Sequence, residues 1–280
     1  MAEPTSDLTP LKSAVDATTT TVLWGTEGTG KTLKVLQEWP LPIVVCNLDR
    51  KLPPHLLALV GPERVEHIYV KDLREDLMAL DHLTGLQVKA SIEQVVTGNL
   101  DFLRGGTLFL DGGTMWRSIL KFADAKIGQL IEQGKRFNPK EKEAINAYIG
   151  AFMHQVTSRG IHLAISAHAA WSWEMRTDPE SGKSSLQRTH NLYPKLDDVA
   201  FEQANLSLLL FKRCECGRPI VNQDGTCTAG GQHKGRTHVV RIVTNKFDTR
   251  TEGTEWPSLT WKTLQTLCFD PEMTEALLGR

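Results

Sequence analysis

The segment at residues 25–32 combines three glycines with a lysine and a hydroxyl side chain. A β-branched run at residues 19–24 precedes it, and an apolar pattern of helical spacing follows it as far as Pro40. Glycines at this spacing, between a strand and a helix, let backbone amides and the positive end of the helix surround a phosphate group. We therefore predict that this Walker A segment binds ATP through Gly25, Thr26, Glu27, Gly28, Thr29, Gly30, Lys31 and Thr32.

Two side chains of this segment, and one further along the chain, are expected to bind the phosphates and Mg²⁺. Lys31 is predicted to contact the β and γ phosphates, and the hydroxyl of Thr32 to bind Mg²⁺. Asp111 directly follows the apolar run at residues 107–110, where the second magnesium ligand, the Walker B aspartate, belongs. Gly112 rather than glutamate comes next, so the residue that activates water is expected elsewhere.

Three more polar residues are candidates for catalysis. Asp49 lies just past the apolar run at residues 43–46, and we favour it for activating water because the ends of parallel strands open onto one crevice. A cap of a turn or helix is the alternative for Asp49, and Glu27 is a further candidate base. His168 ends the strand that follows Asp111, where it could sense the γ-phosphate; a structural histidine is the alternative.

Apolar segments and helical patterns alternate along the chain. Strands are expected at residues 19–24, 43–46, 67–70, 107–110, 161–166, 204–211 and 239–243, and helices at 71–80, 86–96, 114–133 and 140–158. The strands are apolar throughout instead of alternating with polar residues, which is typical of strands buried on both faces. The sequence therefore predicts an α/β fold with a mostly parallel sheet and helices on both faces.

The order of these motifs resembles the RecA-like branch of P-loop ATPases. It is similar in particular to small phage-encoded RecA-like ATPases that act in recombination and single-strand annealing. The shared features are the Walker A segment with Glu27, a carboxylate after the second strand, Asp111 without a neighbouring glutamate, and His168. The resemblance covers roughly residues 19–212 and 238–265, and it departs at Asp49, where RecA-like enzymes usually carry glutamate. It implies an ATP-driven homo-oligomer, a ring or filament, with nucleotide at the subunit interfaces.

Residues 243–250 are similar to a basic, asparagine-containing segment of RecA-like recombinases that reaches the nucleotide of the neighbouring subunit. The resemblance makes Lys246 and Arg250 candidates for such catalytic contacts. The alternative is that both are solvated charges on a turn.

Two segments are expected to face single-stranded DNA. In RecA-like proteins these are the loops after the Walker B strand and after the strand that ends at His168; the second is expected here as a polar loop from Ala169 to Lys195. Aromatic side chains interleaved with positive charges are typical of single-strand binders, although such tryptophans can also pack locally. The candidate DNA-binding residues are Lys135, Arg136, Trp171, Trp173, Arg176, Lys183 and Arg188.

Four soft ligands lie close together in a glycine-rich segment. Cys214, Cys216, Cys227 and His233 could bind a structural Zn²⁺, because three thiolates and an imidazole complete a tetrahedral site. The single residue between the first two cysteines departs from the usual spacing of two, and His238 is a substitute ligand. Free surface thiols are the alternative.

Charge and hydropathy exclude some classes of protein. The 280 residues carry 32 basic and 33 acidic side chains, so the overall charge gives no argument for binding polyanions. No apolar run approaches the ~20 residues of a membrane span, and the N-terminus lacks a secretory pattern. We expect no membrane partner and a cytoplasmic location, which is the host cytoplasm if the protein is phage-encoded.

We divide the chain into three parts. Residues 1–18 are expected as a flexible arm, residues 19–265 as a RecA-like ATPase core, and residues 266–280 as a C-terminal tail. The predicted zinc-binding insertion at residues 213–237 interrupts the core.

The leading hypothesis for the function is an ATPase that binds single-stranded DNA and promotes recombination or annealing as an oligomer, with a single-strand DNA-binding protein as a further partner. One alternative is a motor or loader ATPase for helicase or DNA-packaging machinery. Another is a nucleotide-gated DNA-binding switch with little turnover. A small-molecule kinase would need a lid with clustered arginines, which the sequence does not show.

Overall fold

The computed structural model describes residues 18–49, 52–74, 77, 80–135, 139–177, 184–196, 198–214, 216, 219–220 and 236–279. Its strands are β1 Thr20–Gly25, β2 Ile43–Asn47, β3 Ile68–Asp72, β4 Thr107–Asp111, β5 His162–Thr177, β6 Ser184–Pro194, β7 Leu206–Cys214, β8 Pro219–Ile220, β9 Arg236–Asn245 and β10 Glu255–Trp256. Its helices are α1 Lys31–Glu38, α2 Pro54–Val60, α3 Pro62–Val65, α4 His82–Gly98, α5 Gly113–Ala123, α6 Ala125–Glu132, α7 Pro139–Ser158, α8 Asp198–Gln203, α9 Trp261–Phe269 and α10 Pro271–Leu278, with a 3-10 turn η3 at Thr249–Thr251.

The strands form one sheet in the order β10-β9-β7-β1-β5-β4-β2-β3, with β6 paired to β5 and β8 to β7. The neighbours from β7 through β1, β5, β4 and β2 to β3 all run parallel. The pairs of β9 with β7 and with β10 are antiparallel. This arrangement confirms the predicted α/β class with a mostly parallel sheet.

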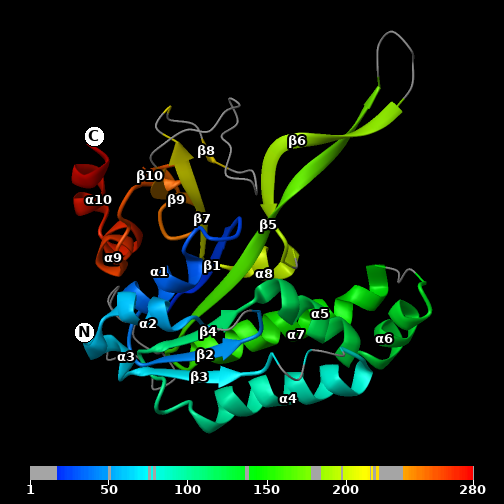
Figure 1. Cartoon of the computed structure of the whole chain (residues 1–280). Helices are drawn as coiled ribbons and strands as arrows, with labels where there is room; N and C mark the ends of the chain where they lie inside the picture. Colours follow the sequence, from blue (N-terminus) through cyan, green and yellow to red (C-terminus); the bar gives the residue numbers. More distant parts are fainter. Residues whose placement is uncertain are drawn as a thin grey trace, which may run out of the picture.

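Helices cover both faces of the sheet (Figure 1). Alternate residues of each strand point to opposite faces, so Val22 and Trp24 pack in one apolar cluster while Leu23 packs in the other. The first cluster takes Ile92 of α4 and Phe152 of α7, and the second takes side chains from α1, α2 and α9. Burial on both faces explains why the strands read as continuous apolar runs.

Two helical predictions are corrected. The helix expected at residues 114–133 is broken at Asp124, whose carboxylate accepts hydrogen bonds from the backbone amides of Lys126 and Ile127 and so caps α6. The helix expected at residues 71–80 is wrong at its start, because Lys71 and Asp72 belong to β3 and pair with β2.

The polar loop predicted from Ala169 to Lys195 is wrong over its described residues. β5 continues past His168 as far as Thr177 and returns through β6 as a long antiparallel hairpin. Figure 1 shows this β5–β6 hairpin projecting well beyond the helices. A two-stranded ribbon outside the core satisfies its backbone by cross-strand hydrogen bonds without an apolar run, so its sequence lacks the usual signal of a buried strand.

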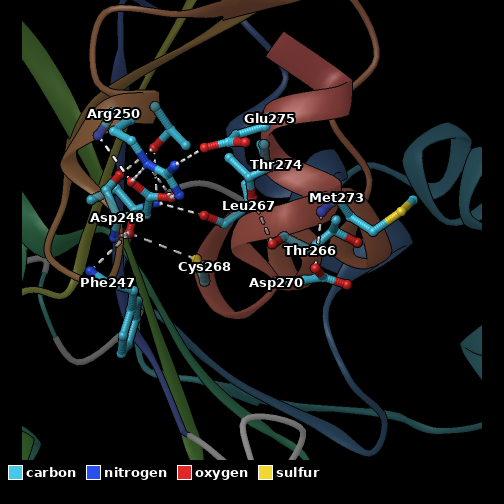
Figure 2. A network of polar contacts seen from close by, with 12 residues as sticks. Phe247, Asp248, Arg250, Thr266, Leu267, Cys268, Asp270, Met273, Thr274 and Glu275 are labelled. Carbon is cyan, nitrogen blue, oxygen red and sulfur yellow. Dashed lines mark hydrogen bonds and ion pairs between the residues drawn. The ribbon is translucent and has the colours of Figure 1, made fainter. Parts of the chain in front are cut away.

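The predicted boundary between core and tail at residue 265 lies inside α9. Leu264 and Leu267 of this helix are buried against the sheet. The fully buried Asn245, at the end of β9, donates from Nδ2 to Thr251 Oγ1 at 2.9 Å and accepts from the amide of Phe247 at 3.1 Å. Figure 2 shows how this turn packs beside α9 and α10. The predicted tail therefore begins within a helix that packs against the sheet.

No helix within the described ranges is long and apolar enough to cross a membrane.

Candidate functional site

The Walker A segment forms the turn between β1, which ends at Gly25, and α1, which begins at Lys31. Gly30 caps α1 with a φ of +86°, a backbone conformation that residues with a Cβ rarely adopt. The ammonium of Lys31 donates to the carbonyls of Gly25 at 3.1 Å and Thr26 at 3.0 Å. The lysine thus lies folded over its own loop, where a phosphate chain would replace the two carbonyls.

Burial lowers the pKa of Lys31 below its ordinary value, and the nearby carboxylates of Asp111, Asp49 and Glu27 act in the opposite direction. The predicted phosphate ligand therefore lies among three acidic side chains, which a bound metal ion would partly neutralise.

Asp111 lies beside Thr32, as the sequence predicts. The hydroxyl of Thr32 donates to the Asp111 carboxylate at 3.1 and 3.0 Å from its two oxygens. Burial raises the pKa of Asp111, while hydrogen bonds from Ser166 and Thr32 lower it. A buried carboxylate next to a hydroxyl at the start of a helix fits the ligands that hold Mg²⁺ beside nucleotide phosphates.

Asp49 and His168 come from different strands and meet at the same end of the sheet. Nε2 of His168 donates to Oδ2 of Asp49 at 2.8 Å, and both side chains are about one-third exposed. Asp49 can lie close to the backbone after Asp111 because residue 112 is a glycine. A Cβ on Gly112 would be only 3.1 Å from the Cβ of Asp49. The space that a glutamate beside Asp111 would need is thus taken by Asp49.

These residues line one cavity of about 530 Å³. Its walls include the phosphate loop, the ends of β2, β4 and β5, and an apolar side formed by the start of α2. The members named above are Glu27, Gly28, Gly30, Lys31, Thr32, Asp49, Asp111, Ser166 and His168, and those near α2 are Leu52, Pro53, His55 and Leu56. The cavity thus brings together the residues predicted to bind the phosphates, to hold the metal and to activate water.

Lys246 and Arg250 do not line this cavity. The ammonium of Lys246 donates to the backbone carbonyl of Glu202. Arg250 is held by Asp248 at 2.7 Å and by Glu275 of α10 at 2.9 Å, as Figure 2 shows. Their predicted contact with a neighbouring subunit's nucleotide stays a prediction.

The predicted DNA-binding residues separate into two regions. Lys135 is exposed just after α6, and Arg136 and Lys183 lie outside the described residues. The backbone positions of the others lie on the β5–β6 hairpin, where Trp173 is opposite Arg188. Trp171 and Arg176 belong to β5 as well.

The predicted zinc ligands are only partly described. Cys214 is buried at the end of β7 and Cys216 is exposed, whereas Cys227 and His233 lie outside the described residues. His238, the substitute ligand, instead lies against the phosphate loop, with Nδ1 at 3.2 Å from the carbonyl oxygen of Thr29. Among the described side chains no group of three or more metal-binding residues occurs. Zinc binding stays a prediction.

Ser166 is a residue of the site that the sequence analysis missed. Its hydroxyl donates to Oδ1 of Asp111 at 2.7 Å and accepts from the amide of Gly112 at 3.0 Å. The available signal was a hydroxyl two residues before His168 in an otherwise apolar strand. Ser166 therefore orients the carboxylate that is predicted to hold the metal.

We expect Ser166→Ala to raise the Mg²⁺ concentration needed for half-maximal ATP turnover by about tenfold, the usual lower range for loss of a group that orients a metal ligand. Titrating Mg²⁺ at saturating ATP measures this. Ser118→Ala is the matched control, because Ser118 lies on α5 outside the cavity lining and its hydroxyl donates to the carbonyl of Thr114 at 3.5 Å. An unchanged Mg²⁺ requirement in Ser166→Ala would contradict the assigned role.

The chain thus has a mostly parallel α/β core, with a Walker A turn between β1 and α1 and a carboxylate at the end of β4. The fold is similar to the crystal structure of the RadB recombinase, with 13% sequence identity, a TM-score of 0.43, and coverage of 85% of this chain and 84% of that chain. No protein-family model and no curated protein matches the chain.

Proposed function

We propose that the protein is a Mg²⁺-dependent ATPase of the phage RecA-like type that binds single-stranded DNA and promotes recombination or annealing as an oligomer. The observation that carries the ATPase part is the convergence of Lys31, Thr32 and Asp111 with the Asp49–His168 pair around one cavity. Each of these groups has a task in phosphoryl transfer to water.

The residues suggest a division of labour during hydrolysis. Lys31 exchanges its two loop carbonyls for the β and γ phosphates, and its charge balances the negative charge of the transition state. Thr32 and Asp111 hold Mg²⁺, which when bound neutralises the phosphate oxygens. Asp49 accepts the proton of the attacking water, and the imidazole of His168 orients its carboxylate.

The β5–β6 hairpin supports the DNA part of the proposal. β5 contains His168 and also forms the first strand of the hairpin. A movement of His168 when the nucleotide changes can therefore be transmitted along β5 to the hairpin. The hairpin places Trp173 opposite Arg188, and this combination of an aromatic residue and an arginine suits stacking of a base and contact with a phosphate.

Oligomerisation would give Lys246 and Arg250 their proposed task. Within the chain Lys246 contacts the carbonyl of Glu202 and Arg250 contacts Asp248 and Glu275. In the proposed assembly both would exchange these partners for the phosphates of a nucleotide on the adjacent subunit.

The experiment compares ATP hydrolysis with and without single-stranded DNA at low and high salt. We expect stimulation by DNA that is lost at high salt, because contacts between basic residues and DNA phosphates weaken as salt rises. The matched variant replaces Trp173 and Arg188 with alanine, which should remove the stimulation and leave turnover without DNA unchanged.

The other outcomes separate the alternatives. Strong turnover that DNA does not affect would favour a motor or loader driven by a protein partner. Tight ATP binding with negligible turnover in all conditions would favour a nucleotide-gated switch. Either result would contradict the DNA-stimulated ATPase.

A further inference from the structure

A second lysine lies beside the phosphate loop. Nζ of Lys212, on β7, is 3.6 Å from the position that a Cβ on Gly28 would take. β7 pairs with β1 on the side opposite β5. Lys212 therefore approaches the loop from the side away from Asp49 and His168.

The β7–β9 pair is pressed closely against the loop, which limits where Lys212 can lie. A Cβ on Gly25 would be only 2.1 Å from the carbonyl oxygen of Leu210, two residues before Lys212 on β7. His238, the cross-strand partner of Lys212 on β9, contacts the carbonyl of Thr29. Contacts at both strands thus hold this side chain pair next to the loop.

Lys212 differs from the neighbouring arginines in lacking a carboxylate partner among the described residues. Arg213 and Arg241 both pair with the carboxylate of Glu255. For Lys212, by contrast, no ion pair is found within the described part of the chain. Since the loop beside it is predicted to bind phosphate, the charge of the half-buried Lys212 at this place favours an anionic ligand.

We propose that Lys212 is a second phosphate-binding lysine of the nucleotide site, and that it contacts the phosphate chain from the β7 side of the loop. The metal ligands and the candidate base lie on the opposite side, so this contact stabilises bound ADP and ATP alike and adds nothing specific to the transition state. His238 is a positioning residue that holds the Thr29 carbonyl. This inference rests on the proposed nucleotide site.

The test measures the Kd for ADP and for a non-hydrolysable ATP analogue by calorimetry, in Lys212→Met and in wild type. We expect both Kd values to rise by about tenfold, the lower range for loss of a hydrogen bond from a charged group. The kcat at saturating ATP should stay within about twofold of wild type. Lys212→Arg, which keeps the charge, should recover most of the ADP affinity, and Lys262→Met on α9 serves as the control.

Three results are distinguishable. An ADP affinity within about twofold of wild type in Lys212→Met would overturn the assignment, and so would a fall in kcat with ADP affinity unchanged. Absence of nucleotide binding in the wild-type protein would instead overturn the proposed function on which this inference rests.

Discussion

Replacing Lys31 with alanine is expected to lower kcat/KM for ATP by about a thousandfold or more, the size of effect that a cation placed on the transferred phosphoryl group can have. The change removes the one lysine of the loop that lies inside the cavity. Steady-state turnover, together with binding of a fluorescent ATP analogue, measures the loss. Near-normal ATPase activity would contradict the assignment of the phosphate site.

The fold should survive this substitution. Among the described residues Lys31 donates to two carbonyls of its own loop, and burial lowers its pKa, so the charged ammonium gains little from the folded state. We expect the thermal unfolding of the nucleotide-free variant to match wild type within a few degrees. Lys34→Ala is the control on the same helix and should leave turnover unchanged, since Lys34 pairs with Glu38 at 3.6 Å and does not line the cavity.

Replacing Asp111 with asparagine is expected to lower Mg²⁺-dependent turnover by about a hundredfold or more and to stabilise the fold. The amide keeps an oxygen that can accept hydrogen bonds from Thr32 and Ser166 but removes a buried negative charge near Asp49. At neutral pH, in metal-free and nucleotide-free protein, we expect the free energy of unfolding to rise by about 1 kcal/mol, a usual size for a stabilising substitution. Chemical denaturation measures it.

The pH dependence of this gain follows from the direction of the pKa shift. Burial raises the pKa of Asp111 in the folded state above its ordinary value of 3.8, so the folded state binds the proton more tightly than the unfolded state. Below the pKa of the unfolded state the Asp111 carboxyl is protonated in both states, so its burial does not lower the stability of the wild-type protein. As pH rises through the folded-state pKa the carboxyl becomes charged, and the free energy of unfolding falls. The advantage of Asp111→Asn should be full above the folded-state pKa and should vanish as pH falls toward the ordinary value of 3.8.

A matched control separates this effect from a general change in charge. Asp101→Asn removes an exposed carboxylate far from the loop in sequence and should change neither turnover nor stability appreciably. A variant Asp111→Asn that is less stable than wild type at neutral pH would show that the carboxylate contributes more through its hydrogen bonds than it costs through burial.

The local parts of the site could be predicted from the sequence. The phosphate loop is eight consecutive residues whose geometry depends on glycine conformations and on the start of α1, and both are local properties. The strands before Asp49, Asp111 and His168 were found because burial on both faces leaves a continuous apolar run. The α/β class follows from the same runs.

Which strand ends lie next to one another depends on the tertiary structure. The position of β5 between β1 and β4 brings Ser166 onto Asp111 and His168 onto Asp49, and the contact of β7 with β1 brings Lys212 to the loop. Strand order depends on pairing between segments far apart in the chain, so no local pattern contains it. The β5–β6 hairpin was likewise missed, because its strands are stabilised by each other outside the core and not by burial of an apolar run.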